Sequence, residues 1–425
     1  MEVQTTKLLD NFASLTPNQD WAFESAGSRN NLTHGYHRYP AKFPPQIVSK
    51  LLDTYATKGD LIVDVFAGCG TTLVESKAHG YKSVGVDINP VAKMITEAKT
   101  SPIHPTTLRN YWDELNPKID LYSPSLVKPR PLHDRVDYWF KPDARNKVAY
   151  LYQEIDAIEN PRVQTFFLCA LSNILKNVSR WLQSSTKPQI DPNKPDRDPF
   201  KDFRYQVKKM IAKNDEFYAK LKESNTLGLR CEIKLADARK TRMWSGKAGM
   251  VISSPPYVTS YEYADIHQLT GYWFEYISDL PGFRKRFIGT FYSGNVQLKT
   301  KTAIAQDAVL QLNEKCDRTA REVASYFNDM YRVTEEIKRL LRTGGVVSIV
   351  LGNTKLKGVK IHCAEAFAEM LEANGFEITD TIKREITTKI LPTIRDKHTG
   401  KFTTTDSKNS QRVYPEEYII IARKQ

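Results

Sequence analysis

The stretch LIVDVFAGCGTT, residues 61–72, decides the fold. It opens with a nearly continuous apolar run, which is typical of a strand buried on both faces of a parallel sheet. Gly68 and Gly70 then predict a tight turn, and residues 71–79 predict a helix. A second buried strand is predicted at residues 83–86. Strand, turn, helix and strand together make a βαβ unit, which indicates an α/β domain.

The turn and the end of the second strand predict a nucleoside-binding site. Glycines at Gly68 and Gly70 let the backbone approach a ligand closely. Asp87 ends the second strand, where an acidic side chain suits hydrogen bonding to ribose hydroxyls. Leu73 takes the place of the third glycine of a dinucleotide motif, and no lysine follows as in a phosphate-binding loop. The ligand is therefore expected to lack a pyrophosphate, which favours S-adenosylmethionine over NAD or ATP.

The rest of the chain predicts a doubly wound sheet of seven strands. Helices alternate with most of the strands, and the last two strands form a hairpin, so one antiparallel strand is expected at the end of the sheet. The stretch Thr343-Gly344-Gly345 is expected to stop a long amphipathic helix. Further strands are predicted at residues 232–235, 249–253, 346–351, 377–383 and 418–422, and further helices at 47–55, 321–341 and 363–374.

Residues 100–228 interrupt the α/β rhythm. Apolar stripes predict helices within 143–184 and 201–222, so this region is interpreted as a largely helical insertion and as the candidate target-recognition region. It divides the chain into an N-terminal segment with the cofactor-binding half, residues 1–99, and a catalytic half, residues 229–425.

The composition indicates a polyanionic partner. The 425 residues carry a net charge of +13, and neutralising nucleic-acid phosphates releases counterions. No apolar run is long enough for a membrane span, so we expect a cytoplasmic protein. The cysteines are odd in number and widely spaced, which predicts neither disulfides nor a metal site: Cys69, Cys169, Cys231, Cys316 and Cys363.

A second motif, Ser253-Ser254-Pro255-Pro256-Tyr257, directly follows a predicted strand. The proline pair is stiff and offers carbonyl acceptors without N–H donors, which suits an amine substrate. The ring of Tyr257 offers a face on which a base can stack. The alternative is a rigid loop with a structural tyrosine.

The pairing of F-x-G-x-G at residues 66–70 with S-P-P-Y resembles the DNA amino-methyltransferases, which modify cytosine N4 or adenine N6. The resemblance implies a Rossmann-like methyltransferase fold and S-adenosyl-L-methionine as cofactor. In that family S-P-P-Y is typical of N4-cytosine enzymes. Residues 37–45 resemble the family's additional cofactor motif, and Asp237 stands where these enzymes bind the adenine amino group.

These patterns give three sets of candidate residues. The candidate catalytic residues are Ser254, Pro255, Pro256 and Tyr257. The candidate cofactor-binding residues are Phe43, Asp64, Phe66, Ala67, Gly68, Gly70, Thr71, Thr72, Asp87, Ile88, Asp237, Ala238 and Ser253. The candidate DNA-binding residues are Arg284, Lys285, Arg286, Lys208, Lys209, Arg395 and Lys397, which an ordinary solvated surface would also explain.

The resulting hypothesis is a site-specific DNA methyltransferase that flips cytosine out of duplex DNA and methylates N4. It would serve in restriction–modification or another DNA-defence system, with a cognate endonuclease as a further possible partner. The alternatives are an N6-adenine enzyme, an RNA base methyltransferase, and a nucleic-acid-binding protein with a degenerate methyltransferase fold. The sequence predicts neither the recognition site nor the oligomeric state.

Overall fold

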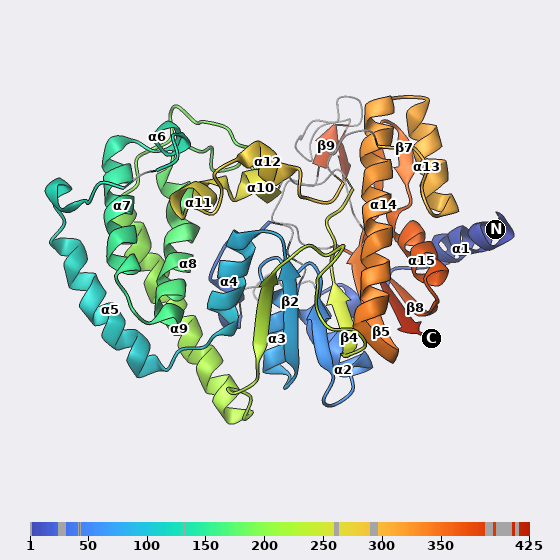
Figure 1. The fold of residues 1–425 in the computed structure, drawn as a ribbon, viewed down its shortest axis with the longest axis horizontal. Helices are drawn as coiled ribbons and strands as arrows, with labels where there is room; N and C mark the ends of the chain where they lie inside the picture. Colours follow the sequence, from blue (N-terminus) through green and yellow to red (C-terminus); the bar gives the residue numbers. More distant parts are fainter. Residues whose placement is uncertain are drawn as a thin grey trace.

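The centre of the molecule is a seven-stranded sheet with the order β3-β2-β1-β4-β5-β11-β8 (Figure 1). The computed structural model describes residues 2–23, 31–40, 42, 44–130, 132–258, 263–289, 296–386, 394–396, 410–412 and 416–425. The strands are β1 (Leu61–Asp64), β2 (Lys82–Asp87), β3 (Cys231–Leu235), β4 (Ala248–Ser253), β5 (Leu341–Leu351), β8 (Phe376–Glu385) and β11 (Glu416–Lys424). Only β11 runs against the others, which confirms the doubly wound α/β sheet.

The antiparallel strand lies one position in from the edge, so the expectation that it would end the sheet is wrong. Ile420 of β11 pairs with Ile349 of β5 on one side and with Thr381 of β8 on the other. The reason is burial. β11 is apolar and buried along most of its length, whereas β8 exposes about half of its residues and therefore suits an edge.

Successive residues of the central strands face two separate cores. Val63 and Val251 face a cluster that includes residues of α14 and α15, whereas Ile62 and Met250 face a cluster with α2. Helices thus cover both faces, as a parallel sheet requires. The helices beside the sheet are α1 (Glu2–Ser14), α2 (Pro45–Tyr55), α3 (Thr71–Ala78), α4 (Pro90–Thr100), α13 (Ala303–Asn313), α14 (Asp317–Leu340) and α15 (Cys363–Ala373).

The stretch Thr343-Gly344-Gly345 was expected to end a helix, but it lies in a strand. Helix α14 already ends at Leu340, and the three residues lie inside β5. The pairing of β4 with β5 shifts register between Ala248 and Met250, next to these glycines. The glycines therefore accommodate an irregular strand start and do not end the helix.

The described part of residues 101–230 consists of helices and loops, with one isolated β-bridge between Trp181 and Ile190. The expected helical stretch 143–184 divides into two helices, because Pro161 starts a new helix whose N-cap is Asn160. The helices are α5 (Pro105–Asp120), α6 (Arg135–Trp139), α7 (Pro142–Asp156), α8 (Pro161–Val178) and α9 (Pro199–Glu223).

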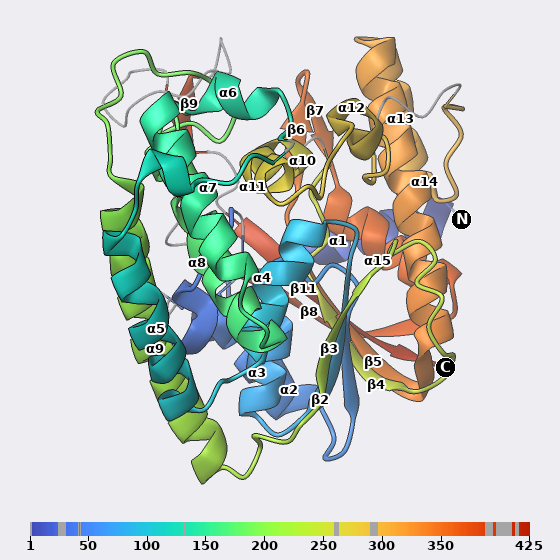
Figure 2. The ribbon, with the colours of Figure 1, turned by 60° about the vertical axis from the view of Figure 1, so that its left-hand side comes forward.

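These helices share one hydrophobic cluster with α4 and with three short helices that follow residues 253–257, the candidate catalytic loop. The short helices are α10 (Tyr263–Ile266), α11 (Gln268–Trp273) and α12 (Leu280–Arg284). Figures 1 and 2 place α10 to α12 near the end of α4 that follows β2. The insertion is therefore packed against the carboxyl edge of the sheet through a common core.

The remaining elements are small. Two small antiparallel sheets pair β6 (Thr354–Leu356) with β7 (Val359–Ile361) and β9 (Ile394–Asp396) with β10 (Ser410–Arg412). The 3-10 helices among the described residues are η1 (Gln19–Trp21), η3 (Leu32–Gly35) and η4 (Pro124–Leu126). Among the helices that the structure describes, none has both the length and the hydrophobicity of a membrane-spanning segment.

Candidate active site at the carboxyl ends of the strands

The turn after β1 is in direct contact with the acidic residue that ends β2. Gly68 and Gly70 have positive φ angles of 50° and 78°, which glycine adopts without strain. A Cβ on Gly70 would lie 2.7 Å from Cγ2 of Thr96, so α4 packs too closely for a side chain. The Gly68 N–H donates a 2.9 Å hydrogen bond to Oδ2 of Asp87. The two features that the sequence pairs therefore form one site.

Asp87 is oriented by the backbone around it. Its Oδ1 accepts a 2.8 Å hydrogen bond from the Asn89 N–H, while Oδ2 accepts the bond from Gly68. Burial raises the pKa of Asp87 to about 6. Each carboxylate oxygen can accept more than one hydrogen bond, so the group retains capacity for two ligand hydroxyls. Ile88, partly exposed, follows directly and offers an apolar contact beside it.

Asp64 ties the glycine turn to the catalytic loop. Its Oδ1 accepts hydrogen bonds from the Ser253 hydroxyl at 2.6 Å and from the Phe66 N–H at 3.0 Å. The residue is 1% exposed, and burial raises its pKa to about 6. These contacts give Asp64 and Ser253 a role in ordering the site. Three further candidate cofactor residues are buried in or just after the same turn: Ala67, Thr71 and Thr72.

The segment with the HRYP sequence covers the glycine turn. A Cβ on Gly68 would lie 3.4 Å from Cε1 of Tyr39. The Tyr39 ring stacks on Tyr263 with centroids 6.0 Å apart and lies 4.9 Å from the ring of His267. Phe43, the candidate cofactor residue from this segment, lies outside the described residues. Tyr39 is the residue of the segment that the structure places against the turn.

Asp237 follows β3 at the same edge, but its carboxylate is already paired. Both oxygens accept hydrogen bonds from the guanidinium of Arg239, the shortest being 2.7 Å. Arg239 also donates a 3.0 Å bond to Asp329 of α14. Burial alone would raise the pKa of Asp237, yet the bonds from Arg239 outweigh it and lower the pKa. Ala238 is buried in the core beneath.

The catalytic loop is held from two sides. The Ser254 hydroxyl donates a 2.9 Å hydrogen bond to the carbonyl of Val350 in β5. The carbonyl of Pro256 accepts a 2.9 Å bond from the hydroxyl of Tyr326 in α14. The Pro255 carbonyl receives no such bond from the part of the chain that the structure describes. The loop is thus fixed while one of its carbonyls is left for a ligand.

Tyr257 is fixed through its hydroxyl, which donates a 3.1 Å hydrogen bond to Oε2 of Glu417. Burial and the neighbouring Glu417 carboxylate hold the pKa of Tyr257 well above its usual value, so the phenol remains protonated. Glu417 pairs with Arg384, and both side chains are buried. A Cβ on Gly352 would lie 3.4 Å from Cε2 of Tyr257, so this glycine lets the ring lie close to β5.

Three of the candidate DNA-binding residues lie on or just after α12. Nε of Arg284 donates a 2.8 Å hydrogen bond to Asp265, so its charge is paired. Lys285 and Arg286 follow and are exposed. Figure 1 shows α12 near the carboxyl edge of the sheet, and Arg239 donates a 2.9 Å hydrogen bond to the backbone carbonyl of Arg286.

Two further candidate DNA-binding residues lie on another helix, α9. Lys208 and Lys209 are exposed on α9, which lies beside α5 on the outside of the insertion (Figure 2). Arg395 lies in β9, where only the backbone is described, and Lys397 lies outside the described residues. The five candidates whose side chains the structure describes thus lie on two separate parts of the fold, α9 and the end of α12.

Several residues at the site were not predicted. Arg239 follows Asp237 by two positions and could have been suggested as its partner by the LADAR sequence. Glu417, Arg384 and Tyr326 carry no local signal, because each acts on a residue that is distant in the chain. Within the described residues, no group of three or more His, Cys, Asp or Glu side chains is placed to hold a metal ion.

Comparison with known proteins finds similarity to DNA methyltransferases. A family model described as DNA methylase, of the N6/N4 type, matches residues 5–98. The type II methyltransferase M.MvaI of Kocuria varians is 26% identical over 395 residues, which cover 85% of this chain and 86% of that protein. The type II methyltransferase M.MjaII of Methanocaldococcus jannaschii is 43% identical over 84 residues, 19% of this chain and 16% of that protein.

A solved structure of a putative DNA modification methylase from Thermus thermophilus with S-adenosyl-L-methionine matches with a TM-score of 0.22 and 19% identity over 44% of this chain and 53% of that one. The family match covers the glycine turn and Asp87, and the M.MvaI alignment spans most of the chain. The chain is therefore similar to DNA amino-methyltransferases along most of its length, which supports S-adenosyl-L-methionine as its methyl donor.

Proposed function

We propose that this DNA methyltransferase modifies the exocyclic N4 of cytosine within a specific duplex sequence. The orientation of the Ser254 hydroxyl supports an exocyclic amino group as the target, and the S-P-P-Y sequence supports cytosine over adenine. The hydroxyl proton is donated to the Val350 carbonyl, so only oxygen lone pairs are left for a substrate. An oxygen that can only accept is suited to an amino group, which offers N–H donors. A neutral acceptor of this kind is typical of the S-P-P-Y sequence and of the N4-cytosine enzymes that carry it.

The reaction begins with the target base outside the duplex, at a cost of a few kcal/mol of unstacking. Tyr257 provides the ring on which the base stacks, and the bond to Glu417 fixes that ring. Ser254 and the Pro255 carbonyl accept hydrogen bonds from the amino group. These bonds draw the nitrogen toward sp³ geometry and direct its lone pair toward the methyl carbon. With the cofactor bound, the nitrogen–carbon bond would form as the carbon–sulfur bond breaks, leaving a neutral thioether, and the nitrogen would release one proton to solvent. Positioning supplies most of the rate gain.

The residues at the carboxyl edge fit the cofactor. S-adenosyl-L-methionine supplies an electrophilic methyl group carried on a sulfonium. Asp87 offers carboxylate oxygens for ribose hydroxyls, because its two backbone bonds leave acceptor capacity. Gly68, which bonds to Asp87, and Ile88, which follows it in the chain, are both partly exposed and could contact the ligand. Asp237 has an acceptor role toward the adenine amino group only through lone pairs that Arg239 does not use.

The biological setting that we propose is restriction–modification. The relatives M.MvaI and M.MjaII are both named type II methyltransferases, which supports a modification role for this chain and a cognate endonuclease as partner. DNA as the substrate also supports a cytoplasmic location. Resistance of methylated host DNA to one restriction endonuclease and not to others would test this setting.

The target atom can be determined by expressing the protein in a host without DNA methylation and measuring the modified nucleosides by mass spectrometry. N4-methylcytosine is the expected product. N6-methyladenine in its place would contradict the target assignment, and methylation of RNA alone would contradict the substrate. Ser254→Ala should lower turnover with little change in cofactor affinity, because Ser254 would touch only the base. The alternative of an inactive nucleic-acid-binding protein fails if any methylated nucleoside appears.

A further inference from the structure

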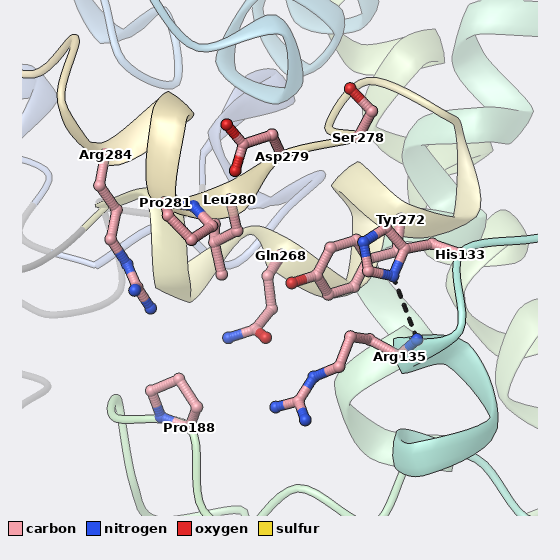
Figure 3. A pocket seen from close by; sticks show the side chains of 10 residues that line it. All are labelled: His133, Arg135, Pro188, Gln268, Tyr272, Ser278, Asp279, Leu280, Pro281 and Arg284. Carbon is pink, nitrogen blue, oxygen red and sulfur yellow. Dashed lines mark hydrogen bonds between the residues drawn. The ribbon is translucent and has the colours of Figure 1, made fainter.

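A pocket of about 340 Å³ lies where the helical insertion meets the segment after the catalytic loop (Figure 3). Its volume falls at the lower end of the range for small-ligand sites. Three stretches that are distant in sequence build it: the start of α6, the loop before α9, and α11 with α12. The residues that matter here are Arg135, Pro188, Gln268, Tyr272, Asp279 and Arg284.

A short series of contacts connects α11, which lines the pocket, with the cofactor edge of the sheet. Gln268 in the pocket follows His267, whose Nδ1 lies 2.9 Å from Nδ2 of Asn89. Asn89 in turn donates its N–H to Asp87. A DNA duplex whose target base lies over Tyr257 would therefore place neighbouring nucleotides near this pocket.

The pocket is lined by both basic and acidic side chains. Figure 3 shows the ends of Arg135, Gln268 and Arg284 directed toward the same space. Arg284 is neutralised by Asp265, and the Gln268 amide nitrogen donates to the backbone carbonyl of Asp265 at 2.9 Å. The carboxylate of Asp279 lies in the lining as well. Positive charge is therefore not in large excess, and a simple phosphate site is not indicated.

Arg135 differs from Arg284 in being uncompensated. Among the described residues, no carboxylate lies within ion-pair distance of Arg135, and its side chain is exposed. Its guanidinium is held 4.2 Å from the centroid of the Tyr138 ring, which limits its freedom. The Tyr272 ring behind it is stacked on His133 with centroids 4.1 Å apart. A side-chain hydrogen bond between Arg135 and Tyr272 further positions the guanidinium, whose other N–H donors remain available for a flat, hydrogen-bonding partner.

We propose that this pocket reads a base of the substrate DNA beside the methylated one, and that Arg135 makes the discriminating contact. The inference rests on the proposed DNA-modifying function. An arginine fork pairs best with O6 and N7 of guanine, so guanine is the base class expected. The mixture of donors and acceptors from Gln268 and Asp279 suits a base edge, which presents both.

The test compares full-length wild type with Arg135→Ala and Arg135→Lys, and uses Arg162→Ala as a matched control. Arg162 is also an exposed arginine of the insertion, but it does not line the pocket. Each protein is expressed in a methylation-free host, the methylated sites are located by sequencing, and rates are measured on duplexes that differ by one base pair. Cofactor affinity is measured by calorimetry.

Arg135→Ala should lose on the order of 10- to 100-fold discrimination at one position of the recognition sequence. Arg135→Lys should lose part of it, because lysine lacks the bidentate fork. Cofactor affinity and the Arg162→Ala specificity should not change. Equal weakening on every duplex, or unchanged specificity, would overturn the assignment. A wild-type protein that binds the cofactor but methylates no DNA would instead show that the proposed function is wrong.

Discussion

The hydroxyl of Tyr257 lies 3.1 Å from Oε2 of Glu417, so the ring proposed to receive the target base is fastened to the last strand of the sheet. Glu417 pairs with the buried Arg384 of β8. Arg384 also donates hydrogen bonds to the carbonyls of Trp21, at 2.6 Å, and Ala22, at 3.1 Å. A continuous series of hydrogen bonds thereby connects the N-terminal segment, β8, β11 and Tyr257.

The first prediction separates the ring of Tyr257 from its hydroxyl. Tyr257→Phe keeps the stacking face and loses one hydrogen bond of about 0.5–1.5 kcal/mol, so kcat should fall by up to roughly tenfold. Tyr257→Ala loses the stacking platform as well, worth about 1–3 kcal/mol, and should be slower still. Steady-state kinetics on duplex DNA would measure both. Equal activity of the two variants would exclude stacking on this ring.

The second prediction concerns the buried ion pair of Arg384 and Glu417. Their side chains are 1% and 9% exposed, so removal of one partner leaves the other charged and desolvated. Glu417→Leu and Arg384→Met should each lower the free energy of unfolding by about 3–5 kcal/mol. The double variant should recover much of that loss, because neither charge is then left alone.

Urea denaturation of the four proteins would complete the cycle for this pair. Strictly additive losses would show that the two side chains do not stabilise each other. The double variant also serves as a control for catalysis. It should remain slower than wild type at saturating substrate, since Tyr257 loses its acceptor even in a stable fold.

The sequence predicts contacts that are formed within a βαβ unit. Gly68 and Asp87 could be paired in advance because a turn and the end of the neighbouring parallel strand meet at one edge by topology. The contact between Tyr257 and Glu417 could not, because it depends on which strand lies beside β5. The predicted order of β8 and β11 is itself wrong, since hairpin partners are equally compatible with either order in the sheet.

Side-chain pairing is a second feature that could not be predicted from the sequence. The LADAR sequence locates Asp237 at the correct edge but does not reveal that Arg239 turns back onto it and reaches Asp329. The proposed base-reading pocket also escapes sequence reasoning. Arg135 and Arg284 are far apart in the chain and meet only because the insertion and α12 share one core.

The third prediction tests the close packing of the glycine turn. Gly70→Ala must place a Cβ 2.7 Å from Cγ2 of Thr96 and keep a φ of 78°. Gly59→Ala is a matched control, because Gly59 has a φ of 89° and no atom within 4 Å of its Cβ position. The control should cost about 1–2 kcal/mol for the backbone conformation alone.

Gly70→Ala should lose about 1–3 kcal/mol more than Gly59→Ala, because α4 must move. Chemical denaturation measures both losses. If the two variants are equally stable, α4 adapts to the added methyl group and the contact with Thr96 does not constrain the turn. Cofactor affinity should fall for Gly70→Ala only, since Gly59 lies before β1 and away from the site.

The fourth prediction is a pH dependence of cofactor binding through Asp87. Burial raises its pKa above the usual value of 3.8, to about 6. The carboxylate that accepts the ribose hydroxyls is therefore present above pH 6 and is lost as the pH falls through 6. If only this form binds, Kd should rise about tenfold for each pH unit below 6. Calorimetric titration between pH 5 and 8 would measure it, with thermal unfolding recorded at each pH.

Two variants distinguish Asp87 from Asp64, whose pKa burial also raises to about 6. Asp87→Ala should weaken binding at pH 8 by about 1.5–3 kcal/mol, the value of a hydrogen bond to a charged acceptor. Asp87→Asn should bind weakly at every pH and show no step near 6, because the titrating acceptor is gone. A step that persists in Asp87→Asn would assign the titration to Asp64, which orders the turn through Ser253. Wild-type affinity that stays constant from pH 8 to 5 would mean that the ionised carboxylate of Asp87 is not required for binding.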